Sequence, residues 1–188
     1  MTSLQTERLI LRNWEARDSE AFHRLNNDPE VMHSFPARRT REEADTMMTR
    51  WQGLYERDGY CFGAVEEKTS GLCVGLCGLA RFPTGIEAGE IRLETGWRLL
   101  PEVWGHGYAT EAAAAWLRLA FENLHEPGIC AFAVPANRAS IAVMKHIGMR
   151  EHPNSPFIHP NVPDSHPHLK EHVLFALSRE QWSVSATE

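Results

Sequence analysis

Gly105 and Gly107 stand one residue apart, between an apolar strand candidate and a long alanine-rich helix candidate. Glycine adopts backbone conformations that other residues avoid, and it has no side chain to keep a ligand from the main chain. The helix begins near Tyr108, where unpaired N–H groups and a partial positive charge suit a phosphate. A strand–turn–helix whose glycines only form the bend explains the spacing equally well, because a glycine pair is a weak motif.

Two well-known phosphate-binding loops do not fit this segment. The dinucleotide fingerprint requires a glycine or alanine three residues after Gly107, and that position is Thr110. A Walker loop requires Gly-Lys-Ser/Thr, which follows neither glycine. A nicotinamide-dependent oxidoreductase is therefore a weak alternative.

Asn137 and Ser140 form a second polar pair, three residues apart. Asparagine is favoured at helix N-caps, so Asn137 is expected to begin a short helix with Ser140 in its first turn. Gly148 is expected to end that helix, because glycine commonly follows the last helical residue. Capping alone can account for Asn137.

Five histidines lie between His152 and His172, in a segment rich in proline and asparagine. Their scattered spacing is not typical of a metal site, and we expect no metal in this protein. A flexible loop over His152–His168 is the favoured interpretation. The four cysteines include no C-x-x-C pair, so we expect reduced thiols in a cytosolic protein.

The elements that position these residues follow from hydrophobic periodicity and turn residues. Strands are expected at Arg8–Asn13, Tyr60–Glu66, Cys73–Arg81, Glu90–Leu99, Ile129–Val134 and Glu171–Leu177. Helices are expected at Ser19–Leu25, after Asn27-Asp28-Pro29, at Glu42–Tyr55, from Tyr108 onward and from Asn137 to Ile147. Turns at Gly71 and Pro83–Gly89 make the three central strands an antiparallel meander. The order predicts a mixed α/β fold with helices on both faces of the sheet.

The chain has 188 residues and a formal charge of −6, with acidic and basic residues mixed along it. This length suits a single domain over residues 1–188, with a core at about 6–182. Scattered charge argues against nucleic acid as a partner, because binding the phosphate backbone needs clustered Lys and Arg. We find no signal segment and no apolar run of transmembrane length, and we expect a soluble, cytoplasmic protein without a membrane partner.

The segment Trp104–Ala109 resembles the acyl-CoA loop of the GCN5-related N-acetyltransferases (GNAT), whose pattern is Gln/Arg-x-x-Gly-x-Gly/Ala. Tryptophan replaces Gln/Arg at the first position. Within this superfamily the chain is most similar to the RimJ/RimL-like branch, in which WGxGYATEA is frequent. The resemblance also covers TERLILR from Thr6, Asn27–Met32, Asn137–Ser140, Gly148-Met149 and the strand His172–Leu177.

The resemblance implies the GNAT fold, a mostly antiparallel central sheet whose fourth and fifth strands splay apart to admit acetyl-CoA. It implies that the pantetheine arm pairs with the main chain of Trp97, Arg98, Leu99 and Leu100, with an N–H near Leu99 facing the thioester oxygen. Pro101 cannot donate a hydrogen bond and would end the ladder. The implied diphosphate site comprises Trp104, Gly105, His106, Gly107, Tyr108, Ala109 and Thr110. Asn137 would contact the pantetheine arm, and Ser140 would lie near the sulfur.

The implied activity is direct transfer of an acetyl group from acetyl-CoA to a primary amine in a ternary complex. Glu94 is the first candidate for the base, because a partly buried carboxylate can have a raised pKa. A structural carboxylate and a water relay without a single base are open alternatives. Alternation places Glu90 and Arg92 on the same strand face as Glu94.

The group that protonates the leaving thiolate is open. Met144 stands where many relatives have a proton-donating tyrosine, and methionine cannot donate. Ser140 is then the remaining side-chain candidate. The same departure supports the alternative of a non-catalytic acyl-CoA sensor or regulatory module.

The acceptor pocket is expected from Asn26–Phe35, the face of the fourth strand and the His152–His168 loop. The run Phe157-Ile158-His159-Pro160 is similar to one found in part of the RimJ/RimL-like branch, and this resemblance implies that His159 faces the acceptor. The sequence does not choose among a protein N-terminus, a polyamine and an amino acid. A homodimer is compatible with such a fold.

Overall fold

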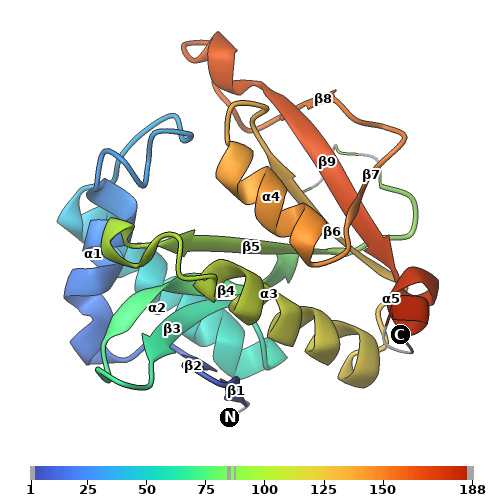
Figure 1. Cartoon of the computed structure of the whole chain (residues 1–188). Coiled ribbons are helices and arrows are strands. Elements are labelled where there is room, and N and C mark those ends of the chain that lie inside the picture. Colours follow the sequence, from blue (N-terminus) through green and yellow to red (C-terminus); the bar gives the residue numbers. More distant parts are fainter. Residues whose placement is uncertain (1–2, 84–85, 87, 186–188) are drawn as a thin grey trace. The chain divides into compact units, whose positions relative to one another are not determined.

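The protein was analysed as a computed structural model that describes residues 3–83, 86 and 88–185. The chain divides into two compact units (Figure 1). The first comprises Met1–Ala80 and Gly96–Trp116, and the second comprises Arg81–Thr95 and Leu117–Glu188. Each unit is therefore built from two separate stretches of chain. The organisation as a single domain stays a prediction.

The strands of the first unit are neighbours in chain order. They are β1 (Leu4–Gln5), β2 (Leu9–Arg12), β3 (Phe62–Glu67), β4 (Cys73–Arg81) and the last four residues of β5 (Leu93–Leu99). The pairs β1–β2, β2–β3 and β3–β4 are antiparallel. Where β5 ends, the N–H of Leu100 donates to the oxygen of Val74 at 2.9 Å. The predicted antiparallel order of the β3 and β4 strands is confirmed, and β5 follows β4 as expected.

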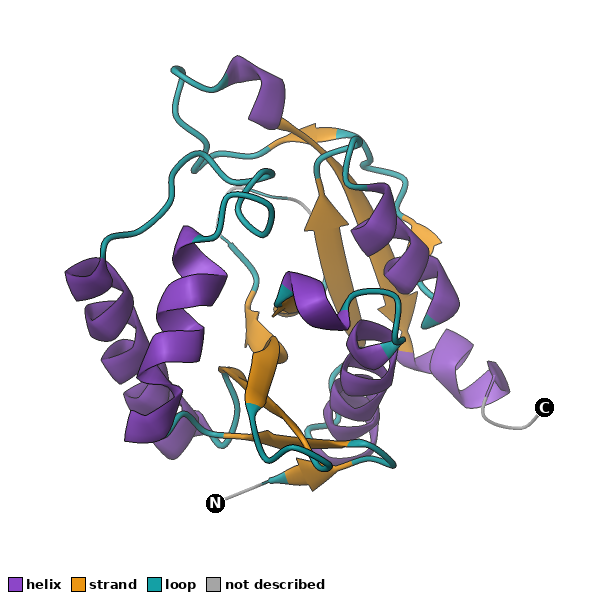
Figure 2. Ribbon diagram, turned by 60° about the vertical axis from the view of Figure 1, so that its left-hand side comes forward, coloured by secondary structure: helices purple, strands orange, loops and turns teal. Residues whose placement is uncertain are grey.

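Two helices of the first unit lie side by side, α1 (Ser19–Asn27) and α2 (Arg41–Asp58), as Figure 2 shows. A short 3-10 turn, Ala16–Asp18, precedes α1. Thr40 and Glu43 form a capping box at the start of α2, and Gly59, with φ +80°, ends it. One face of α2 enters the core: Ala44 and Met48 are buried, and Met47 and Trp51 pack against the same cluster.

The helix predicted after Asn27-Asp28-Pro29 is wrong. Residues 29–34 form turns only. The Asp28 carboxylate accepts hydrogen bonds from the N–H groups of Glu30 and Val31, at 2.8 and 3.1 Å. This side-chain cap supports a tight turn, and the helical ladder does not continue beyond it.

After β5 the chain forms a 3-10 turn, Pro101–Val103, and then α3 (Tyr108–Arg118), which runs into a π-helical turn at Leu119–Asn123. The helix predicted from Tyr108 onward is confirmed, and one face of it is apolar and buried. Ala113, Trp116, Leu117 and Ala120 have no exposed surface.

The second unit contains the first three residues of β5 together with β6 (Gly128–Ala133), β7 (Arg150–Glu151), β8 (Phe157–Ile158) and β9 (Glu171–Ser178). The register between β5 and β6 is parallel and comprises Leu93 with Ile129 and Glu94 with Cys130. The strands β6, β7 and β8 all pair with β9 antiparallel. The mixed α/β fold with a mostly antiparallel sheet is thus confirmed.

Two expectations for the second unit need correction, and one helix was not expected. The strand predicted from Glu90 begins only at Leu93: Glu90 lies in a turn, so strand alternation does not place Glu90 and Arg92 on the face of Glu94. The segment predicted as a loop, His152–His168, contains the two-residue strand β8. The helix α5 (Arg179–Ser185) was not predicted.

The helix α4 (Arg138–His146) packs against β6 within the second unit (Figure 1). Gly148, with φ +85°, follows its end as predicted. A 3-10 turn, Pro167–Leu169, precedes β9. In the described residues, no helix has both the length and the apolar character needed to cross a membrane.

Candidate functional site

The two glycines of the loop have the same unusual backbone conformation. Gly105 and Gly107 both have φ +78°, a region that residues with a side chain rarely adopt. A Cβ built on Gly105 would meet no described atom within 4 Å beyond its chain neighbours. At Gly107 it would meet only Nη2 of Arg8, at 3.5 Å. The main chain here therefore borders open space, and the loop fits a ligand that approaches the backbone closely.

The N-terminus of α3 follows this loop directly. Its first helical hydrogen bond runs from the N–H of Glu111 to the oxygen of Gly107, at 3.0 Å. The N–H groups of Tyr108, Ala109 and Thr110 precede that bond and have no acceptor within the helix. They carry the partial positive charge of the helix end, which favours an anion.

The carboxylate of Glu111 lies in the first turn of α3, where its charge would compete with an incoming anion. It is held by other groups: the Thr6 hydroxyl donates to it at 2.5 Å, and Nε of Arg8 donates at 2.7 Å. Burial alone would raise the pKa of Glu111, but these hydrogen bonds outweigh burial and lower the pKa. Glu111 is thus charged, and Arg8 compensates its charge.

Arg8 also touches the loop. Its Nη1 donates to the main-chain oxygen of His106 at 2.9 Å, and its guanidinium lies over the Tyr108 ring, 4.7 Å from the centroid. On another side, the Tyr108 hydroxyl donates to Glu67 of β3 at 2.6 Å. Sequence reasoning missed Arg8, Glu67 and Glu111 as supports of the loop. The TERLILR block marked the region of Arg8 without indicating this role.

The end of β5 is tied to the loop through Trp104. Its indole Nε1 donates to the main-chain oxygen of Leu99 at 2.8 Å, while the residue as a whole is 46% exposed. Leu99 and Leu100 are buried, and Trp97 and Arg98 are half-buried. The strand stops before Pro101, where the ladder was predicted to end. The first unit thus contains both segments predicted to bind CoA, residues 97–100 for the pantetheine arm and residues 104–110 for the diphosphate.

Glu94 belongs to the second unit and lies opposite Cys130 in the parallel register. Burial raises the pKa of its carboxyl group to about 8. Burial is the only cause of this shift, and no hydrogen bond or ion pair within the described residues offsets it. A carboxyl group with this pKa can accept a proton near neutral pH, as a general base must.

Asn137 and Ser140 also belong to the second unit. The side-chain oxygen of Asn137 accepts a hydrogen bond from the Ser140 N–H at 3.1 Å, which confirms the predicted N-cap of α4. Ser140 lies in the first turn and is half-buried. Met144, one turn further along α4, is 1% exposed and has no proton to donate.

His159 lies in an aromatic cluster of the second unit. Its ring centroid is 4.9 Å from that of His172 and 5.2 Å from that of Phe132. Burial, and then the neighbouring His172, lower the pKa of His159 to about 4. The imidazole is therefore neutral at physiological pH. Among the described residues, no group of three or more His, Cys, Asp or Glu side chains is arranged to bind a metal ion.

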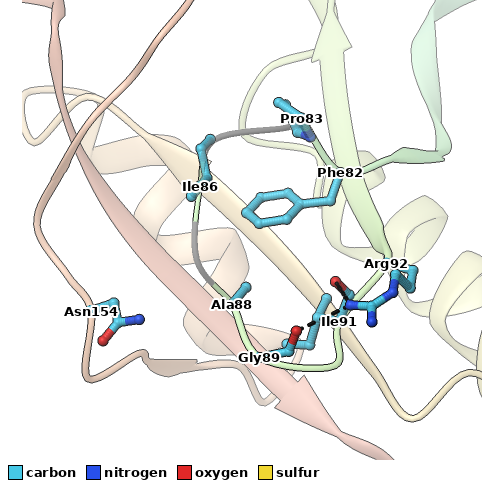
Figure 3. Close-up of a pocket in the computed structure, with 8 residues that line it drawn as sticks. All are labelled: Phe82, Pro83, Ile86, Ala88, Gly89, Ile91, Arg92 and Asn154. Atoms are coloured by element: carbon cyan, nitrogen blue, oxygen red, sulfur yellow. Dashed lines mark hydrogen bonds between the residues drawn. The ribbon is translucent and has the colours of Figure 1, made fainter.

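A pocket of the second unit lies between the segment Phe82–Arg92 and Asn154 (Figure 3). The ring of Phe82 points into the space beside Ile86 and Ala88. Of the segments predicted for the functional site, the His152–His168 loop contributes to this pocket, through Asn154. The predicted turn at Pro83–Gly89 includes residues 84, 85 and 87, which lie outside the described residues.

Comparison with known proteins connects both units to one family. Residues 8–150 match the family model of the acetyltransferase (GNAT) domain. The uncharacterized protein YkkB of Bacillus subtilis is 36% identical over 154 residues, which cover 79% of this chain and 85% of YkkB. The FsC-acetyl coenzyme A-N(2)-transacetylase of Aspergillus fumigatus is 32% identical over 185 residues, which cover 96% of this chain and 77% of that protein.

A solved structure agrees with this match. The acetyltransferase (GNAT family) from Bacillus anthracis aligns with a TM-score of 0.77 and 27% identity, over 95% of this chain and 99% of that chain. The family model covers well over half of the sequence, and the similarity in structure extends over nearly all of it. This chain therefore belongs to the GNAT acetyltransferase family.

Proposed function

We propose that this protein transfers an acetyl group from acetyl-CoA to a primary amine, by direct attack of the amine in a ternary complex. The observation that carries the proposal is the loop with Gly105 and Gly107 at φ +78°, which leads into the first N–H groups of α3, for which the helix itself has no acceptor. In a chain of the GNAT family, this arrangement supports the binding of the CoA diphosphate by residues 104–110. The main chain of residues 97–100 would bind the pantetheine arm.

The reaction forms a C–N bond and breaks the thioester C–S bond. The attacking nitrogen must lose a proton, and the leaving thiolate must gain one or be stabilised. Glu94, whose pKa burial raises to about 8, is the proposed acceptor of the proton, directly or through water. Ser140 is the proposed group beside the thiolate, because Met144 has no proton to offer.

The cysteines support direct transfer over an acyl-cysteine intermediate. All four are free thiols. Burial raises the pKa of Cys61 to about 11 and of Cys73 to about 12, and it raises those of Cys77 and Cys130 further. The thiolate is the nucleophilic form of cysteine, so little of it is present at neutral pH. Free thiols also suit the proposed cytoplasmic location.

The test is release of free CoA from acetyl-CoA in the presence of a panel of amines that comprises N-terminal peptides, polyamines and amino acids. We expect thiol release that depends on the amine, together with an acetylated amine of the expected mass. If acetyl-CoA binds tightly and no amine in the panel is acetylated, the protein is a non-catalytic acyl-CoA sensor. The buried Met144 favours that second candidate.

A further inference from the structure

The side chain of Arg98 extends from β5 to the end of α1, within the first unit. Its Nη1 donates to the main-chain oxygen of Leu25 at 3.1 Å and to Oδ1 of Asn26 at 2.8 Å. Asn26 is 1% exposed, and its own Nδ2 donates to the oxygen of Phe22 at 2.8 Å. The amide of Asn26 is therefore fixed with its oxygen toward Arg98. Nη1 of Arg98 therefore has an acceptor for each of its two N–H groups.

The opposite edge of the guanidinium has no partner. Nε of Arg98 is buried and makes no hydrogen bond in the described residues. Nη2 makes no hydrogen bond in the described residues either, and unlike Nε it is not fully buried. The N–H groups of Nε and Nη2 point the same way, and together they fit the two oxygens of a carboxylate.

The surroundings of Arg98 contain positive charge without a matching negative charge. No carboxylate of the described residues contributes to its pKa, which burial and Arg39 alone shift. Burial, and then repulsion by Arg39, lower the pKa of Arg98 to about 10, so the group is still protonated at neutral pH. An unpaired buried donor on a charged group is costly, and a bound anion removes that cost.

The ring of Phe35 completes the arrangement. The Arg98 guanidinium lies over this ring, 4.3 Å from its centroid. This cation–π contact favours one orientation of the guanidinium plane. Phe35 is 42% exposed. The ring that covers one face of the guanidinium is therefore itself partly open to solvent. Arg98, Asn26 and Phe35 all belong to the first unit.

We propose that the Nε–Nη2 edge of Arg98 binds a carboxylate of the amine acceptor, so that the preferred acceptors are amines that carry a carboxylate, such as amino acids. This inference rests on the proposed function. The phosphates of CoA are the other possible source of an anion. They are assigned to the loop at residues 104–110, and a planar carboxylate fits the two parallel donors of Arg98 better.

The test compares three matched acceptors: an amino acid, its amide and the corresponding amine without the carboxyl group. The main variant is Arg98→Lys, because a lysine can still donate to Asn26 and Leu25 and so preserves the end of α1. Arg98→Gln is the second variant. The matched control is Arg24→Gln, which removes an arginine of α1 that is paired at the surface with Glu102.

For the amino acid, we expect both Arg98 variants to raise KM about ten- to hundredfold, the value of a charge-assisted hydrogen-bond pair. For the amide, the simple amine and acetyl-CoA, the rise in KM should be much smaller than for the amino acid, because residue 98 is assigned to the pantetheine arm through its main chain alone. An equal loss on all three acceptors would show a structural role for Arg98. A rise confined to KM for acetyl-CoA would assign the edge to a CoA phosphate. Either result overturns the proposal.

A binding measurement separates this inference from the proposed function. Without acetyl-CoA, the amino acid should raise the melting temperature of the parent protein and of Arg24→Gln, but not that of Arg98→Lys. If this pattern appears and no amine is acetylated, the carboxylate site stands and the proposed function fails. If simple amines are acetylated and the carboxylate has no effect in either measurement, the function stands and the site is refuted.

Discussion

Arg8 and His106 are 98 residues apart in the sequence, and the guanidinium of one donates to the main-chain oxygen of the other at 2.9 Å. The same side chain neutralises Glu111 at the start of α3. An arginine near the N-terminus thus holds the glycine loop in place and also removes a negative charge that would oppose a phosphate there.

Replacing Arg8 with Gln should weaken acetyl-CoA binding. The loop loses one hydrogen bond, and Glu111 loses its compensating charge. Because the contact is half-exposed, we expect KM for acetyl-CoA to rise only about three- to tenfold. Arg57→Gln removes an exposed arginine paired with Asp58 and serves as the control. An unchanged KM in the Arg8 variant would show that the loop keeps its shape without this contact.

Gly107→Val should abolish binding of acetyl-CoA, measured by calorimetry, and leave the fold mostly intact. A valine at φ +78° is strained by about 1–2 kcal/mol, and its side chain fills the space beside the main chain. Gly59→Val is a matched control, because Gly59 has φ +80°, has open space around it and lies at the end of α2. The control should show the same strain in melting experiments and normal affinity. Equal affinity in both variants would contradict the assignment of the loop.

Glu94→Gln should lower kcat by about a hundredfold or more, the contribution of a general base, with little change in affinity for acetyl-CoA. In the parent protein, activity should rise as the pH passes through about 8, where Glu94 loses its proton. The variant should lose that step in its pH–rate profile. Glu90→Gln, which changes an exposed carboxylate in a turn, is the control. Full activity of Glu94→Gln at neutral pH would remove Glu94 from the mechanism and favour a water relay.

The raised pKa of Glu94 also makes a prediction for stability. The folded protein binds this proton more tightly than the unfolded chain, whose carboxyl has a pKa near 4.5. The tighter binding of this proton contributes to the free energy of unfolding. That contribution is fully present below pH 4.5 and is lost as the pH rises through about 8. We therefore expect Glu94→Gln to increase the free energy of unfolding in urea by about 2–3 kcal/mol at pH 9, and by little at pH 4. Equal effects at both pH values would argue against burial of the charge.

Asn137 can be tested for capping and for binding separately. Asn137→Ala should reduce the free energy of unfolding by about 1 kcal/mol, because the N-cap of α4 is lost. Asn137→Ser keeps a capping oxygen and should keep the stability. If the amide also contacts the pantetheine arm, KM for acetyl-CoA rises in both variants. Parental affinity in Asn137→Ser would assign Asn137 to the cap alone.

Local sequence predicted the elements around the site well. The strand β4 was predicted with its observed bounds, and the N-cap at Asn137 and the end of α4 at Gly148 are as expected. These features depend on side chains a few residues apart, through periodicity, capping and the freedom of glycine at positive φ. The wrong helix after Pro29 has a local cause too: the Asp28 carboxylate caps a turn there, and such a side-chain cap has the same local pattern as the start of a helix.

The amino-acid sequence by itself determined the family, the glycine loop and the helix that follows it. Each of these is recognised from short blocks of residues that are neighbours in the chain. Only the tertiary structure decided that Arg8 supports the loop, that Glu94 titrates near neutral pH and that Arg98 presents an unpaired edge. The physical reason is that these properties arise from burial and from partners far along the chain. Desolvation and long-range hydrogen bonds exist only once the chain has folded.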